Sequence, residues 1–211
     1  PRIVAARGSV RVIDVETRAR MPPRSNSARA SSSTPVSPMT PSAAVIEKPA
    51  NLEFEDAACL PTAWLTAYRM LTRNDLSQGD TILVQGASGG VASAAIQLGH
   101  QLGLRVWATA RTEAKRSFAL ELGADAAFEA GARLPERVDA VIETVGEATW
   151  SHSLKALRPG GTIVVCGATS GYNPPAELNR VFFLQLRVQG STMGTREELA
   201  QLAELVAATG L

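Results

Sequence analysis

The sequence predicts an α/β fold with a doubly wound sheet of six parallel strands, preceded by a disordered N-terminal tract. Three observations support this prediction. Short apolar runs alternate with amphipathic helical segments from residue 51 onward. A glycine-rich turn joins the first strong apolar run to a helical segment. The composition changes sharply near residue 43, so we expect an atypical tract at 1–44 and a folded domain at 45–211.

The N-terminal tract is poor in large apolar side chains. Residues 19–42 are rich in Ser, Pro and Arg, and such a segment cannot bury enough surface to offset its ordering entropy. We therefore expect disorder or a linker there. Upstream, only residues 9–15 alternate in polarity, as an isolated strand would. The chain begins with Pro1 and not Met, so we expect an upstream part to be missing. The Arg-, Pro-, Ser- and Ala-rich composition of residues 1–42 motivates the hypothesis that they are translated out of frame.

The remaining elements follow in order. A helical stretch at 54–71 contains Pro61 as a break. The predicted strands are 81–85, 104–110, 124–128, 138–145, 162–166 and 186–191. The helices between and after them are 89–102, 112–122, 147–157 and 195–210, with a turn at 158–161. Thr112 is the expected cap of the second of these helices, and Thr195 to Glu198 form a capping box.

The turn from Gly86 to Ala92 has the sequence Gly-Ala-Ser-Gly-Gly-Val-Ala. It lies between a strand and a helix, which is the context of a Rossmann-type dinucleotide site. The helix N-terminus offers free N–H groups to a diphosphate. We expect Gly89 to let the backbone approach the diphosphate and Gly90 to keep the turn tight. The alternative is a helix-capping turn without a ligand.

The end of the second strand indicates which dinucleotide is preferred. NAD sites usually place an acidic residue there, whereas this chain has Arg111, with Lys115 one helical turn later. Two cations would pair with a 2′-phosphate, so NADP(H) is favoured over NAD(H). The alternative is that both are solvated surface cations. Glu113 falls within the helix start, where it complements the dipole.

Residues 45–210 resemble the coenzyme-binding domain of the medium-chain dehydrogenase/reductase family, nearest its quinone oxidoreductase and zinc-type alcohol dehydrogenase-like branches. The matching stretches are Glu55-Asp-Ala-Ala58, Leu65-Thr-Ala-Tyr68, Gln78-Gly-Asp80, Gln85 to Val91, Leu122-Gly-Ala-Asp125, Val145-Gly146, Arg158-Pro-Gly-Gly161 and Gly190-Ser-Thr-Met-Gly194.

The resemblance implies three groups of cofactor contacts. The diphosphate would lie against Gly86, Ser88, Gly89, Gly90 and Val91. The adenosine phosphate would meet Arg111 and Lys115. The ribose and nicotinamide would lie near Thr66, Val145, Gly146, Gly167, Ala168 and Thr169. Simple turn geometry is the alternative explanation for the glycines.

The resemblance also implies hydride transfer to a carbonyl, quinone or enone. The family, however, carries its catalytic half on a GroES-like domain of about 120 residues, and residues 1–42 do not resemble it. We therefore name no catalytic residue, and a non-catalytic nucleotide-binding fragment or regulator remains an alternative. The short-chain reductase motif Tyr-x-x-x-Lys is absent, since neither Tyr68 nor Tyr172 is followed by the lysine. A methyltransferase would be expected to carry an acidic residue at the end of the second strand, and Arg111 at this position argues against that class.

We expect no zinc in this chain. In the zinc-dependent branch a cysteine stands where Thr62 is found here, and Cys59 is better explained as a residue of a helix core. Both Cys59 and Cys166 are expected to be buried, reduced thiols. His100 and His152 have no partner at ligand spacing and are expected on the surface.

Composition limits the partners. A net charge of +1 argues against a broad nucleic-acid surface, and no apolar run is long enough to span a membrane. Without a secretory signal, the default expectation is a cytoplasmic protein. The partners that we expect are a dinucleotide, a small-molecule substrate if a catalytic domain is supplied, and a second copy paired through the strand at 186–191.

Overall fold

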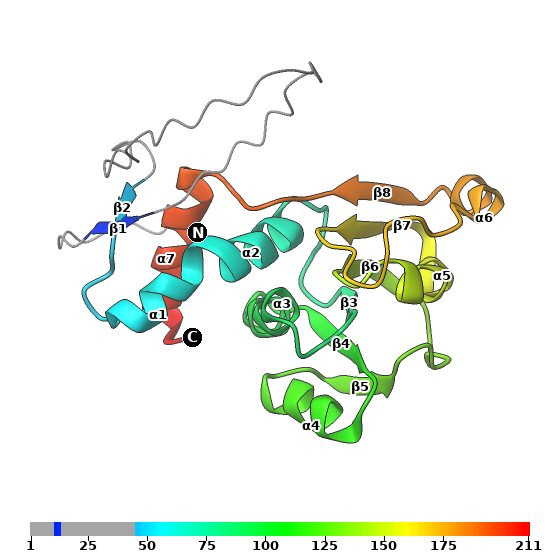
Figure 1. Cartoon of the computed structure of the whole chain (residues 1–211), viewed down its shortest axis with the longest axis horizontal. Coiled ribbons are helices and arrows are strands. Elements are labelled where there is room, and N and C mark those ends of the chain that lie inside the picture. Colours follow the sequence, from blue (N-terminus) through cyan, green and yellow to red (C-terminus); the bar gives the residue numbers. More distant parts are fainter. Residues whose placement is uncertain (1–10, 14–44) are drawn as a thin grey trace, which may run out of the picture.

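The computed structural model describes residues 11–13 and 45–211. Its centre is a six-stranded parallel sheet in the order β5-β4-β3-β6-β7-β8 (Figure 1). The strands are β3 (Thr81–Val84), β4 (Arg105–Ala110), β5 (Ala126–Glu129), β6 (Val138–Glu143), β7 (Leu157–Val165) and β8 (Arg187–Gly190). This confirms the predicted fold class. The predicted disordered tract lies outside the described residues, apart from 11–13.

Helices cover both faces of the sheet. Ile82 and Val84 of β3 belong to one apolar cluster, whereas Leu83 belongs to a second cluster on the opposite face. The first cluster includes residues of α2 (Leu65–Thr72), α3 (Gly90–Gln101), α4 (Glu113–Glu121) and α7 (Arg196–Thr209). The second includes residues of α5 (Glu147–Ala156) and α6 (Leu178–Phe183). Burial on both faces explains why the central strands carry apolar residues at neighbouring positions and not only at alternate ones.

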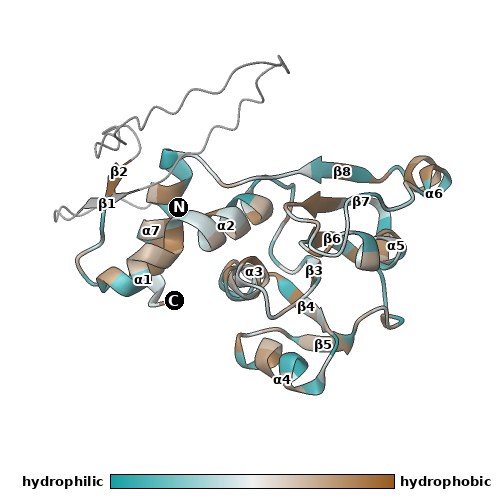
Figure 2. Cartoon of the chain, in the orientation of Figure 1, coloured by the Kyte–Doolittle hydropathy of each residue, from teal (hydrophilic) through white to brown (hydrophobic). Residues whose placement is uncertain are grey.

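Hydropathy separates the centre of the sheet from one edge. Figure 2 shows β6 and β7 in brown and β8 in teal. β8 is the last strand in the sheet order, and its Val188 is 51% exposed. The neighbouring α6, which the sequence did not predict, exposes Phe182 and Phe183. This edge of the sheet is therefore open on the described part of the chain.

The helical stretch before the sheet differs from the prediction. Instead of a break at Pro61, α1 (Phe54–Cys59) continues through a π-helical turn, Leu60–Trp64, into α2. The Leu65 N–H reaches the Leu60 carbonyl, five residues back. Pro61 lies in the first part of this turn, whose wider hydrogen-bond pattern accommodates a residue without an N–H and lets the helix continue.

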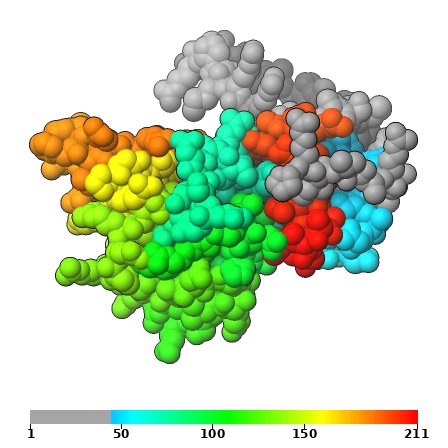
Figure 3. Space-filling view, turned by 180° about the vertical axis from the view of Figure 1, so that it is seen from behind, coloured from blue at the N-terminus to red at the C-terminus, as the bar shows by residue number. Residues whose placement is uncertain are grey.

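Two smaller differences concern strands. The predicted turn at 158–161 lies inside β7, where the register with β6 shifts from Val138↔Leu157 to Ala140↔Thr162. The strand expected to be isolated is paired: β1 (Arg11–Ile13) runs antiparallel to β2 (Val45–Glu47). The Arg196 side chain of α7 donates to the Val45 carbonyl, and the view from behind shows α7 in red beside the light-blue segment that begins at residue 45 (Figure 3). No described helix is long and apolar enough to cross a bilayer.

Candidate functional site

A cleft of about 670 Å³ opens at the carboxyl ends of the central strands. This is where parallel α/β sheets bind ligands, at the point where the strand order reverses, here between β3 and β6. Most of the predicted contact residues line it, namely Gly86, Ser88, Gly89, Gly90, Val91, Arg111, Lys115, Val145, Gly167 and Thr169. Thr66, Gly146 and Ala168 are not among its lining residues.

The glycine turn is anchored at Gly86. This residue has φ +73°, and a Cβ there would lie 2.7 Å from Val145 Cγ2. The next residue, Ala87, donates its N–H to the Thr109 carbonyl at the end of β4. The residue that makes the turn tight is therefore Gly86 and not Gly90, whose Cβ would make only ordinary contact with Ala63.

Gly89 is different because nothing in the described part of the chain requires a glycine there. Its backbone angles, φ −80° and ψ 150°, suit any residue, and a Cβ would meet only the Gly86 carbonyl, at 3.6 Å. The first intrahelical bond of α3 runs from Ser93 N–H to the Gly89 carbonyl. The N–H groups of residues 90–92 consequently have no partner within the helix. Gly89 leaves space directly in front of these donors, which fits the approach of a diphosphate.

Arg111 and Lys115 form a cationic side of the cleft. Both are exposed, and the Thr112 side chain between them caps α4 by accepting from the Lys115 N–H at 3.4 Å. Across the described residues, neither cation takes part in an ion pair. Both charges are therefore available to an anion in the cleft.

The opposite wall consists of two loops that follow β6 and β7. Gly146, with φ +92°, packs so closely that a Cβ would lie 2.5 Å from the Gly171 carbonyl oxygen. Ser170 joins the loops, because its hydroxyl accepts from Ala148 N–H at 2.9 Å and donates to the Val145 carbonyl at 2.8 Å. Gly146 and Ala168 thus lie at the contact between the loops, behind the surface that faces the cleft.

Thr66 does not reach this cleft in the described structure. It lies on α2, is 7% exposed, and its hydroxyl donates to the Thr62 carbonyl at 2.7 Å. The hydroxyl is consequently used within the helix. A contact of Thr66 with a nicotinamide stays a prediction from the family resemblance.

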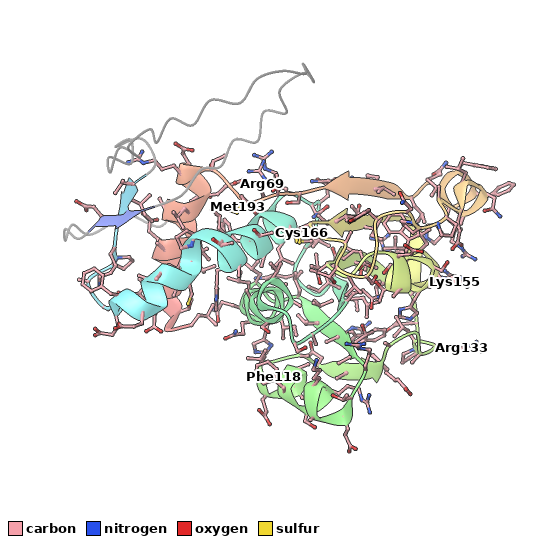
Figure 4. The ribbon with its side chains drawn as sticks, viewed as in Figure 1. Arg69, Phe118, Arg133, Lys155, Cys166 and Met193 are labelled. Carbon is pink, nitrogen blue, oxygen red and sulfur yellow. The ribbon has the colours of Figure 1, made fainter. Side chains whose placement is uncertain are left out.

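The two cysteines differ from the expectation of two buried thiols. Cys59 is exposed, because it lies on the outer side of α1, so its placement in a helix core was wrong. Cys166, labelled in Figure 4, follows β7, lines the cleft and is half-buried. Burial, and to a lesser extent the Glu143 carboxylate, raises the pKa of the Cys166 thiol to about 11.

Several lining residues were missed by the sequence analysis. They are Thr109, Ala110, Ala130, Thr144, Ala148, Thr149, Cys166 and Ser170. Most of them follow a strand directly or begin the next helix, so the rule that ligands bind at the carboxyl ends of parallel strands would have indicated them. His152 was also misplaced as a surface residue. It is half-buried, with Nε2 2.8 Å from the Ala132 carbonyl and Nδ1 2.9 Å from Gln85 Nε2.

Comparisons with known proteins agree with this geometry. Residues 90–208 match the family described as zinc-binding dehydrogenase. The chain is 30% identical over 198 residues to the crotonyl-CoA carboxylase/reductase of Cereibacter sphaeroides, covering 77% of this chain and 46% of that protein. It is 30% identical over 174 residues to the quinone oxidoreductase of Homo sapiens, covering 75% of this chain and 52% of that protein.

Among solved structures, a 2-octenoyl-CoA carboxylase reductase in complex with NADP and 2-octenoyl-CoA aligns with a TM-score of 0.72 and 28% identity. The alignment covers 78% of this chain and 44% of that one. The chain spans about half the length of these relatives. Because the family match covers more than half of the chain, and the sheet order and cleft agree with it, the chain belongs to the zinc-binding dehydrogenases of the medium-chain dehydrogenase/reductase family.

Proposed function

We propose that this chain is the NADP(H)-binding part of a medium-chain oxidoreductase. The observation that carries the proposal is one cleft that combines the free N-terminus of α3 with the unpaired cations Arg111 and Lys115. A dinucleotide phosphate presents two anionic groups, a diphosphate and a 2′-phosphate, and the cleft offers a donor set for each. The NADP complex of the 2-octenoyl-CoA carboxylase reductase supports the same cofactor.

The order of the strands in the sheet determines the orientation that we propose for the dinucleotide. The adenosine half would lie over β4, where Arg111 and Lys115 meet the 2′-phosphate, and the diphosphate would lie in front of Gly89. The nicotinamide half would then lie over β6 and β7, against Val145, Gly167 and Thr169, with Gly146 and Ala168 shaping the wall behind them. When bound, the nicotinamide supplies hydride transfer, and the chain binds and orients it.

A binding titration tests this proposal. We expect Arg111→Ala to weaken NADPH binding about 10- to 100-fold, since it removes a charge-assisted hydrogen bond, and to leave NADH binding nearly unchanged. Arg133→Ala, an exposed cation that does not line the cleft, is the matched control. Equal losses for both dinucleotides would argue against a 2′-phosphate site at Arg111.

Gly89→Ala separates a ligand site from a simple capping turn. Because its Cβ has space and its backbone angles are ordinary, the variant should unfold at the same urea concentration as the parent, or a slightly higher one. If a diphosphate approaches this backbone, the added methyl group should reduce NADPH affinity at least about tenfold. Unchanged affinity would support the capping turn without a ligand.

The reaction of the whole protein is a further part of the proposal. The names of the relatives suggest reduction of a quinone or of an acyl-CoA thioester such as crotonyl-CoA, and we propose NADPH as the reductant. An assay of NADPH consumption with quinones and enones should be run beside the binding titration. Binding without turnover would favour the second candidate, a nucleotide-binding module without catalysis.

Zinc takes no part in this proposal. In the described part of the chain, no three His, Cys, Asp or Glu side chains come together in a way that could hold a metal ion. The exposed Cys59 thiol, for instance, donates a hydrogen bond to the Glu55 carbonyl of its own helix, at 3.5 Å. These residues do not fit the metal that the family's description implies, and the expectation of a chain without zinc stays a prediction.

We also propose that two copies pair through β8. It is an edge strand with an exposed Val188, and the adjacent α6 exposes Leu178, Phe182 and Phe183. Light scattering at micromolar concentration should give the mass of a dimer. Val188→Lys should shift it toward the monomer, and a strict monomer for the parent chain would contradict the pairing.

A further inference from the structure

A fully buried carboxylate lies at the end of β6, just behind the wall of the cleft. Glu143 has no exposed surface and does not line the cleft. Its Oε1 accepts from the N–H of Val145 at 2.8 Å and from the N–H of Gly146 at 3.0 Å. These two donors belong to the loop whose Val145 side faces the cleft. The Glu143 side chain therefore holds the wall by hydrogen bonds to the backbone N–H groups of the wall loop.

The carboxylate itself is held by two hydroxyl groups of α5. Thr149 Oγ1 donates to it, with the two carboxylate oxygens at 2.8 and 2.9 Å. Ser153 Oγ donates to Oε2 at 2.5 Å and in turn accepts from Gln85 Nε2 at 2.9 Å. With four donors around it, the buried charge is satisfied, and it cannot rotate without leaving one of them unpaired.

The network continues beneath the floor of the cleft. The side-chain Oε1 of Gln85 accepts from the hydroxyl of Thr109, which lies near the end of the neighbouring strand β4 and lines the cleft. The second Gln85 N–H faces His152 Nδ1, whose ring donates to the Ala132 carbonyl through Nε2. Side chains from three adjacent strand ends are thus fixed relative to one another, and Glu143 is the member that reaches the wall.

The loop is also held from its other side. Ser170 N–H donates to the Val145 carbonyl at 2.8 Å, and the Gly171 carbonyl accepts from Glu147 N–H at 3.1 Å. The peptide units of residues 145–147 therefore have partners on both sides. Without the carboxylate, the two N–H groups of Val145 and Gly146 would be left without these partners, and the loop would lose its inner support.

We infer that Glu143 is a positioning residue that presets the Val145–Gly146 wall for the nicotinamide half of the dinucleotide. The inference rests on the proposed function for the identity of the ligand. It assigns to Glu143 no contact with the cofactor. Glu143 bonds directly to the loop after β6 and to α5, and it reaches β4 only through Ser153 and Gln85, so we expect the adenosine half over β4 to bind almost independently of it.

Two ligands distinguish this role from general destabilisation. NADPH occupies both halves of the cleft, whereas adenosine 2′,5′-bisphosphate occupies only the adenosine half. We expect Glu143→Ala to weaken NADPH binding about tenfold or more, because two buried donors lose their acceptor. The affinity for the bisphosphate should stay within about twofold of the parent value. Glu143→Gln should restore most NADPH affinity, because its Oε1 accepts from the same two N–H groups and its amide faces Ser153.

A matched control lies on the same strand. Asp139, at the start of β6, accepts from the Thr81 N–H at 2.7 Å, so it also holds a backbone donor, but at the amino end of the sheet. Asp139→Ala should lower stability toward urea without changing the affinity for either ligand. If Glu143→Ala does not fold, Glu143→Asp tests the same point, because a carboxylate one methylene shorter no longer reaches both N–H groups.

Amide hydrogen exchange tests the positioning without a ligand. Faster exchange confined to residues 144–148 in Glu143→Ala, reversed in Glu143→Gln, supports the inference. Unchanged exchange there, or equal weakening of NADPH and the bisphosphate, overturns it. Failure of the parent chain to bind either nucleotide would instead refute the proposed function, while the exchange measurement would still decide the role of Glu143.

Discussion

Replacing Gly146 by alanine should reveal how tightly the two loops of the cleft wall are packed. Gly146 has φ +92° and ψ −129°, a region that side chains rarely adopt. An alanine Cβ would lie 2.5 Å from the Gly171 carbonyl oxygen and 2.8 Å from Ala168 Cα. Both of these are backbone atoms, so a rotamer change cannot relieve the overlap.

The expected cost has two parts. Holding a residue with a Cβ in this backbone region costs about 1–3 kcal/mol. Moving the facing loop away from the methyl group costs about 1–3 kcal/mol more, as other cases of overpacking do. Together they predict a loss of about 4 kcal/mol of unfolding free energy, which for a domain of this size lowers the melting temperature by about 8–16 °C.

Gly131→Ala is the control that isolates the backbone part. Gly131 has φ +80°, but no atom lies within 4 Å of a Cβ built there. It should lose only about 1–2 kcal/mol. Urea unfolding of both variants, followed by circular dichroism, measures the difference. If Gly146→Ala loses no more stability than Gly131→Ala, the close contact between the two loops is refuted.

Two further predictions concern titratable groups. Because the pKa of Cys166 is raised to about 11, its alkylation by iodoacetamide at pH 8 should be more than about tenfold slower than that of the exposed Cys59, and should accelerate as the pH rises toward 11. Peptide mass spectrometry separates the two sites, and equal rates would contradict the burial of Cys166. Burial pushes the pKa of Glu198 upward, but hydrogen bonds from Thr195, Arg73 and Arg69 outweigh it and leave the pKa below its ordinary range. The contribution of ionised Glu198 to the stability of the folded state should be complete above the ordinary carboxyl pKa and should be lost as the pH falls through the lowered pKa. Glu198→Gln should therefore lose less stability on acidification than the parent in urea titrations, and identical pH dependence would contradict this.

The sheet was predictable from sequence because each strand carries its own local signal. The strands at 81–85 and 138–145 carry apolar residues on both faces, as buried parallel strands do, and turns bound them. The capping box at Thr195 was also predictable, since both partners lie within four residues. The π-helical turn at Leu60–Trp64 was not, because packing of the whole helix against α3 and α7 overrides the local effect of Pro61.

The part of the site that consists of residues adjacent in sequence was predictable. The spacing of the glycines predicts the turn that begins at Gly86. The sequence did not show, however, that Gly86 is the residue with a left-handed backbone conformation and that Gly90 has ordinary helical geometry. The Glu143 network gave no such signal. Its members come from β4, β6, α5 and the position directly after β3, and only the folded sheet brings Gln85 next to Ser153.

The Glu143 network beneath the cleft also limits which substitutions this sequence can accept. Gln85, Glu143 and Ser153 each supply a donor or acceptor that a neighbour requires, so a single replacement leaves a buried group unpaired at a cost of about 1–3 kcal/mol. Replacing both partners of a bond by apolar groups of the same shape can be nearly neutral. Mutations at these positions are therefore tolerated in pairs more readily than singly. Across relatives, we expect the identities of these residues to change together, because hydrogen bonds join their side chains.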